Sequence, residues 1–205
     1  MISGIGGRHP LRGKYPLLND EEQEGPMKKV LSGAGLCMIA IITACGAGDE
    51  RTHEGPMSFE APTGEGWEQV PVESDLPDHA WTMGLHYNAD ETPKSLRVMP
   101  DVDSRPDAST AVSTLIAVCR FTEVYATDCQ GTGQEAADIP GSDNTVQADF
   151  TYSGESGEQG RGRFWVAADE DSDVVSAVEY AGIGVDEDEL EAFGETIEFD
   201  PDNAE

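Results

Sequence analysis

Three aspartates, Asp169, Asp171 and Asp173, occupy alternate positions, as the first oxygen ligands of a calcium loop do. The rest of the EF-hand pattern is absent, because Val174 stands where the loop needs glycine and Tyr180 stands where it needs the closing glutamate. The spacing therefore favours a solvated acidic turn between two strands. We keep these aspartates as the candidates for a calcium site and assign no other metal ligand.

A second chemical signal lies near the N-terminus. Lys28 and Lys29 precede an apolar run of 13 residues from Val30 to Ile42, which is the length of a secretory h-region and too short to span a bilayer comfortably. The run ends in Ile42-Thr43-Ala44-Cys45, which resembles the lipobox of bacterial lipoproteins. The resemblance implies cleavage before Cys45 and attachment of acyl chains, such as palmitate, to that cysteine. The alternatives are an uncleaved N-terminal anchor and an ordinary signal peptide with a chance cysteine.

The lipobox divides the chain into segments. We expect residues 1–26 to be a start-site artefact or a disordered extension and residues 27–44 to be the signal peptide. Residues 45–56 then form a flexible tether that carries a folded domain away from the membrane. The expected location is the cell membrane, with the protein lipid-anchored at the extracytoplasmic face.

Cys119 and Cys129 remain in the mature chain, with nine residues between them. In an oxidising compartment this pair favours a disulfide. The alternatives are a buried free pair and a metal site, but no histidine lies near the pair and the C-x-x-C spacing of zinc sites is missing.

No motif predicts catalytic residues. The segment Gly131-x-Gly133-x-x-Ala136 resembles a dinucleotide fingerprint, but Pro140 and Gly141 leave no room for the helix that must follow it. Ser156 lacks the second glycine of a nucleophile elbow. The histidines His53, His79 and His86 have no fixed spacing to a nucleophile, so we expect them to be surface or partly packed residues.

The composition limits the partners. The chain of 205 residues has a net charge of -29, which opposes binding to nucleic acid. The same charge favours a basic protein partner or a cationic ligand. No cofactor is predicted.

The patterning from Met57 onward predicts a single α+β domain over residues 57–200, followed by a disordered tail at 201–205. We expect one antiparallel sheet of about six to eight strands and two packed helices. The predicted helices are Asp107–Phe121, with Ser109 as its N-cap, and Asp186–Phe193. The predicted strands lie at 58–62, 81–87, 95–99, 122–126, 145–152, 163–167, 174–180 and 195–199, and a polar glycine-rich connection is expected at 153–162.

The neighbours Phe164 and Trp165 alternate along one predicted strand. One of the two rings therefore faces the core and the other faces outward, where it could line a ligand groove.

The order of elements resembles a known family. Phe59-Glu60-Ala61-Pro62 with Gly66-Trp67, a middle helix, Arg163-Phe164-Trp165-Val166 with Val174-Val175, and the segment from Glu189 to Phe199 look like the PsbP-like fold. Small actinobacterial envelope lipoproteins of the mycobacterial LpqN type are similar. The resemblance implies a non-enzymatic binding or assembly domain and supplies no catalytic residues.

The sequence thus predicts a lipid-anchored cell-envelope protein that binds an unknown ligand and is not an enzyme. Two alternatives remain open, namely a calcium- or metal-dependent accessory protein and a small envelope hydrolase with an unrecognised site.

Overall fold

The structure is a computed structural model, and it describes residues 51–62, 65–72, 81–87, 92–102, 107–120, 127–154 and 157–204. The helices are α1 (Ala108–Cys119), α2 (Glu187–Gly194) and the 3-10 helix η1 (Pro201–Asn203). The strands are β1 (Thr52–Glu54), β2 (Met57–Phe59), β3 (Trp67–Gln69), β4 (Met83–Tyr87), β5 (Lys94–Met99), β6 (Thr127–Gly131), β7 (Glu135–Ala136), β8 (Asn144–Ser153), β9 (Gln159–Asp169), β10 (Val174–Ile183) and β11 (Glu198–Phe199).

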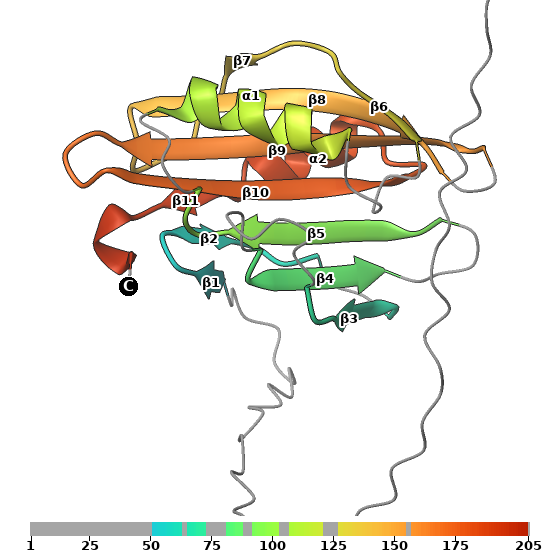
Figure 1. The fold of residues 1–205 in the computed structure, drawn as a ribbon. Coiled ribbons are helices and arrows are strands. Elements are labelled where there is room, and N and C mark those ends of the chain that lie inside the picture. Colours follow the sequence, from blue (N-terminus) through green and yellow to red (C-terminus); the bar gives the residue numbers. More distant parts are fainter. Residues whose placement is uncertain are drawn as a thin grey trace, which may run out of the picture. The chain divides into compact units, whose positions relative to one another are not determined.

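The strands of the described ranges form two antiparallel sheets. The larger has eight strands in the order β3-β4-β5-β10-β9-β8-β6, with β7 paired to β8, and the smaller has the order β1-β2-β11. Two long hairpins, β8–β9 and β9–β10, make the centre of the larger sheet (Figure 1). Helix α1 lies in front of this centre and α2 lies behind it.

Both faces of the larger sheet are buried at strand β9. Successive side chains of β9 point to opposite sides of the sheet, and they join two different cores. Phe164, Val166 and Ala168 join a core beneath α1, together with Val112 and Leu115 of the helix. The intervening side chains of β9 join a second core, beneath α2 and the smaller sheet. That second core contains Trp165, Ala167, Leu190, Phe193 and Phe199, among others.

The predicted α+β class is confirmed, and the eight-stranded sheet agrees with the predicted strand number. The prediction of one sheet is wrong, because β1, β2 and β11 form a separate small sheet. The predicted strand at 122–126 lies outside the described residues. The prediction that either Phe164 or Trp165 faces outward is wrong. Both rings are buried, because α1 covers one face of the sheet and α2 with the smaller sheet covers the other.

The predicted tether at 45–56 is wrong at its C-terminal end, where β1 pairs with β2. The side chain of Arg51 attaches this segment to the domain. It donates hydrogen bonds to the carbonyl oxygen atoms of Ser58 and Thr196 and forms an ion pair with Glu198 at 3.3 Å. The predicted disordered tail is wrong at residues 201–203, which form η1 under an N-cap from Asp200.

The glycine-rich connection predicted at 153–162 is shorter than expected, because β9 already begins at Gln159. Gly160 and Gly162 belong to the strand, where they accept the rings of Tyr152 and Phe150 from β8. A Cβ atom would lie 2.2 Å from Tyr152 Cζ at Gly160 and 2.4 Å from Phe150 Cζ at Gly162. These glycines therefore make room for cross-strand aromatic packing and do not mark a loop.

Helix α1 begins one residue after Asp107, which is the N-cap in place of the predicted Ser109. One carboxylate oxygen of Asp107 accepts a hydrogen bond from the backbone N–H of Thr110 at 2.7 Å, and this bond lowers the pKa of the carboxyl group. Aspartate is as good an N-cap as serine, so Asp107, which directly precedes the helix, can take the position. Ser109 instead donates to Gln134 Oε1 at 2.9 Å, which ties the loop before β7 to the helix.

The two cysteines expected to pair are joined by a disulfide. Cys119 ends α1, Cys129 lies in β6, and their Cα atoms are 5.9 Å apart. The bond connects the helix to the edge strand of the larger sheet.

We expect the double variant Cys119→Ser/Cys129→Ser to lose about 2–3 kcal/mol of unfolding free energy, because the short closed loop no longer restricts the unfolded chain. Denaturant unfolding of the wild-type protein and of the variant, each with and without reductant, measures the loss. Reductant must lower the stability of the wild type alone. Equal stability of oxidised and reduced wild type would contradict the expectation.

Candidate functional site

A concave groove lies on the sheet face that carries α2, between that helix and the segment from β7 to the start of β8. Its volume is about 410 Å³, within the range of ligand-binding pockets. The sheet supplies its floor, α2 one wall, and the β7 segment the other. The groove is lined by Glu135, Ala137, Asp138, Pro140, Gln147, Arg163, Trp165, Glu187, Glu191, Gly194 and Glu195.

Helix α2 places its carboxylates in the groove through simple periodicity. Glu187, Glu191 and Glu195 follow each other at intervals of four residues, so they share one face of the helix. The opposite face of the helix carries Leu190 and Phe193 into the core. The geometry of a short amphipathic helix thus turns three glutamates toward one wall of the groove.

The start of α2 is held firmly. Asp186 caps the helix by accepting from the backbone N–H of Glu189 at 2.9 Å, and the acidic first turn suits the positive end of the helix dipole. The carboxylate of Glu189 accepts a hydrogen bond from Lys94 Nζ at 2.6 Å and another from the hydroxyl of Tyr180. Burial and this bond to Glu189 raise the pKa of Tyr180.

Arg163 forms the charged part of the floor. It faces Asp149 across the β8–β9 pair, and its guanidinium donates to the carboxylates of Asp149 and Glu187. Only 4% of its side chain is exposed. Burial lowers the pKa of Arg163, but the hydrogen bonds to Asp149 and Glu187 outweigh that effect and raise it, so the side chain stays cationic. The neighbouring Arg161 pairs with Glu187 at 2.8 Å.

The remaining carboxylates of the groove have no cationic partner within the described ranges. Arg161 and Arg163 are committed to Asp149 and Glu187. The other four groups, which we call the rim carboxylates, are Glu135, Asp138, Glu191 and Glu195. They are exposed, and Glu135 accepts one hydrogen bond from Gln147 at 2.7 Å. The groove is therefore a site of negative potential whose own cations are already neutralised.

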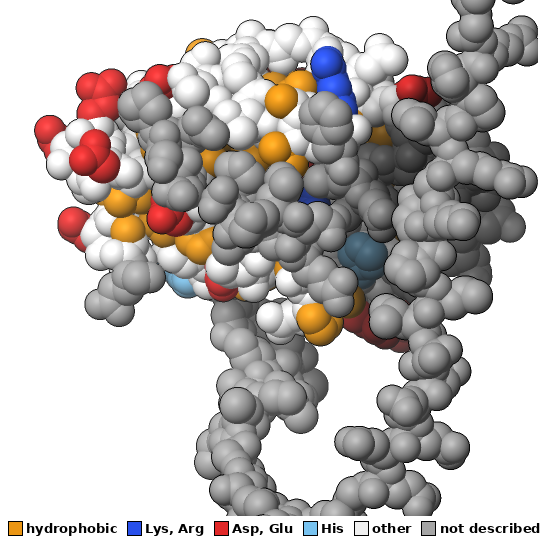
Figure 2. Space-filling view, viewed as in Figure 1, with side chains coloured by type: hydrophobic (Ala, Val, Ile, Leu, Met, Phe, Trp, Pro, Cys, Tyr) orange, Lys and Arg blue, Asp and Glu red, His pale blue; other side chains and the backbone are white. Residues whose placement is uncertain are grey.

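The acidic turn predicted from Asp169, Asp171 and Asp173 is present as the β9–β10 turn, where Figure 2 shows carboxylates gathered at one end of the domain. Asp169 accepts hydrogen bonds from Ser172 Oγ at 2.7 Å and from its backbone N–H at 2.8 Å, which lower the pKa of Asp169. Asp173 takes a left-handed backbone conformation with φ 58°. In the described part of the chain, no group of three or more His, Cys, Asp or Glu side chains gathers as a metal site.

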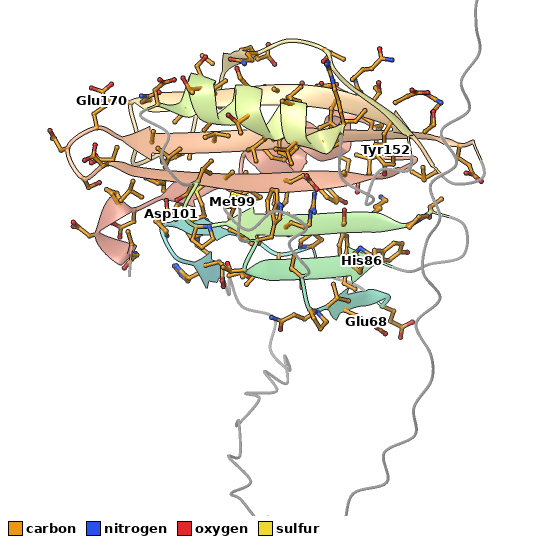
Figure 3. The ribbon with its side chains drawn as sticks, in the orientation of Figure 1. Glu68, His86, Met99, Asp101, Tyr152 and Glu170 are labelled. Atoms are coloured by element: carbon orange, nitrogen blue, oxygen red, sulfur yellow. A yellow bond between two sulfur atoms is a disulfide. The ribbon has the colours of Figure 1, made fainter. Side chains whose placement is uncertain are left out.

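The other candidate residues are not brought together. His53 lies on β1 of the small sheet, whereas His86 lies on β4 of the large one, and both are exposed (Figure 3 labels His86). His79, Ser156 and the lipidation candidate Cys45 lie outside the described residues. The segment from Gly131 to Ala136 connects strand β6 to strand β7, so no helix follows the glycines.

Sequence reasoning missed a buried ion pair on the opposite face of the sheet. Arg97 of β5 donates from Nε to Glu179 Oε1 at 2.9 Å and from Nη2 to Oε2 at 2.7 Å. The side chain of Glu179 is fully buried, and the guanidinium of Arg97 lies 4.4 Å from the ring centroid of Trp81. A charged residue in a strand is ordinarily expected to be exposed to solvent. Arg97 and Glu179 are 82 positions apart in the sequence, so no local pattern indicates that they pair.

Burial and, secondarily, the charge of Glu179 raise the pKa of Tyr152 to about 12 (Figure 3). The unfolded chain loses this proton near pH 10, while the folded chain keeps it to about pH 12. The contribution of Tyr152 to stability is therefore complete below pH 10 and falls as the pH rises from 10 to about 12. Denaturant unfolding at stepped alkaline pH tests this expectation, and Tyr152→Phe must flatten the fall. An identical fall in the variant would contradict it.

The folded domain is thus an antiparallel α+β domain with one helix on each face of its main sheet. Its structure is similar to the crystal structure of LpqN, a protein involved in cell envelope biogenesis of Mycobacterium tuberculosis, with a TM-score of 0.45 and 17% sequence identity. The match covers 74% of this chain and 90% of LpqN. The sequence resemblance predicts a neighbour of this type. No protein-family model and no curated protein matches the chain.

No helix among the described residues is long and apolar enough to cross a membrane.

Proposed function

We propose that this protein is a cell-envelope protein, exported and anchored by lipid on Cys45, whose folded domain is a non-enzymatic binding module for a cationic ligand or a basic partner. The positive n-region, the apolar run and the lipobox-like segment before Cys45 support the anchor. One observation carries the binding function. It is the groove beside α2, whose rim carboxylates have no cationic partner in the described part of the chain.

The groove differs from an open acidic surface in its shape. On an open surface, water and salt screen each carboxylate within about 10 Å. In a concave site with a buried protein floor, several carboxylates act together on one bound cation, and their field is less screened. The wall from α2 and the rim residues Glu135 and Asp138 surround such a cation from two sides.

The described structure adds no observation in favour of the two alternatives. The carboxylate of Asp169 serves the hairpin turn, and the described histidines lie on separate sheets. We therefore propose neither a calcium-dependent function nor a hydrolase.

Calorimetric titration with spermidine, a flexible trivalent cation, tests the binding function. The variant Glu191→Gln/Glu195→Gln removes two charges of the groove wall, and Glu65→Gln/Glu68→Gln is the matched control, removing two exposed charges at strand β3 and just before it. We expect the groove variant to bind spermidine about threefold to tenfold more weakly, because each lost pair contributes up to about 1 kcal/mol. The control variant must bind almost as the wild type does. Equal weakening of both variants, or no binding by the wild type, would contradict the proposal.

A further inference from the structure

The floor of the groove contains a polar group that has no partner among the described residues. Trp165 is 2% exposed, and its ring packs against Phe193 with a centroid distance of 5.4 Å. Its indole N–H donates a hydrogen bond to no residue within the described ranges. Tryptophan can only donate at this nitrogen, and a buried tryptophan N–H usually finds an acceptor.

This donor has access to the groove. Among the described residues, the only side-chain nitrogen or oxygen that is both sealed from solvent and unbonded is Arg51 Nε. The Trp165 nitrogen is therefore not sealed, and both Trp165 and Gly194, the glycine beside this nitrogen, line the groove. A Cβ atom on Gly194 would lie 2.7 Å from this nitrogen, so the glycine leaves the polar edge of the indole uncovered.

The groove thus offers two different recognition elements. The rim carboxylates attract a cation, whereas the Trp165 N–H needs a hydrogen-bond acceptor at the floor. An amine or polyamine satisfies only the first element. A carboxylate ligand satisfies the second but is repelled by the rim, and the cation of Arg163 that could attract it is already paired.

We propose that the groove recognises a basic peptide segment, whose lysine or arginine side chains pair with the rim carboxylates while a main-chain carbonyl accepts from Trp165 Nε1. This proposal rests on the proposed cation-binding function and names its ligand class. A peptide carries cations and neutral carbonyl acceptors in the same short length, which fits the combination in the groove. The main-chain carbonyl adds a contact that is insensitive to salt.

The test compares two probes of the same charge. One is a hexapeptide of alternating lysine and alanine, blocked at both ends, and the other is spermidine. Each is titrated into the wild type, Trp165→Phe and the control Trp67→Phe, which alters a half-buried tryptophan of β3. We expect Trp165→Phe to bind the peptide about threefold to tenfold more weakly, as the loss of one hydrogen bond predicts, and to bind spermidine unchanged. Trp67→Phe must leave both affinities unchanged.

A second readout follows the wild-type protein itself, so it does not depend on the affinity of a variant. The three indole N–H resonances of the nitrogen-15-labelled wild type are followed during both titrations, and the Trp165 signal is assigned by its absence in Trp165→Phe. The proposal predicts that the peptide shifts the Trp165 resonance downfield and that spermidine does not. Peptide binding with no change at Trp165 would overturn the peptide proposal while leaving the cation-binding function intact. Absence of binding by both probes would overturn the cation-binding function itself, and the peptide proposal with it.

Discussion

Replacing Glu179 by glutamine is expected to lower the free energy of unfolding by about 3–5 kcal/mol. Glu179 is fully buried and holds Arg97 through two hydrogen bonds. Glutamine keeps the size of the side chain but removes its charge, so the guanidinium of Arg97 loses the buried carboxylate that it binds through two hydrogen bonds. The cost is that of removing one partner from a buried ion pair, and urea unfolding followed by circular dichroism measures it.

A second ion pair provides the matched control. Lys94 and Glu189 also connect distant elements, but their side chains remain 20% and 32% exposed. We expect Glu189→Gln to cost about 1 kcal/mol or somewhat more, because solvent screens the pair and Tyr180 can still donate to the amide oxygen.

The double variant Arg97→Met/Glu179→Gln separates the charge from the packing. Removing the buried cation as well must recover much of the loss seen in Glu179→Gln alone. Equal costs for Glu179→Gln and Glu189→Gln, or no recovery in the double variant, would show that burial of the Arg97 charge is not the cause.

The second large effect concerns the anchor. We expect Cys45→Ser to move the protein almost completely from the membrane fraction to the soluble fraction, because the hydroxyl cannot receive the thioether-linked lipid. Each buried methylene of an acyl chain contributes about 0.8 kcal/mol, so the acyl chains of the expected lipid dominate membrane attachment. Cell fractionation followed by immunoblotting measures the distribution.

Cys37→Ser is the matched control, since Cys37 lies within the apolar run and follows the bulky Leu36. It must leave the protein in the membrane fraction. Loss of membrane association in both variants, or in neither, would contradict lipidation at Cys45.

The sequence predicted the elements whose periodicity is carried by many residues. Both helices and the long hairpin from β9 to β10 were placed correctly to within a few residues, because their apolar positions repeat with a clear period. Strand β1 was missed for the opposite reason. Its three residues contain no apolar pattern, and the neighbouring Arg51 secures the segment through groups that follow it by 7 and 145 positions.

The groove could be predicted only in part. The interval of four residues from Glu187 to Glu195 is visible in the sequence and places these carboxylates on one helix face. The approach of Glu135 and Asp138 from the β7 segment is not visible, because it depends on how β7 pairs with β8. The sequence predicted that one of the rings of Phe164 and Trp165 lies in the core and that the other lines a groove, whereas Trp165 does both. Its ring belongs to the core, while its N–H edge borders the groove.

The central claim is that the domain is exported and lipid-anchored, since the disulfide, the cationic partner and the tether all depend on that location. Intact mass spectrometry of the protein extracted from native membranes, with and without reductant, tests it most directly. The account predicts a chain that begins at acylated Cys45 and gains two hydrogens on reduction of the Cys119–Cys129 bond. An unlipidated chain that begins at Met1 and does not change on reduction would contradict it.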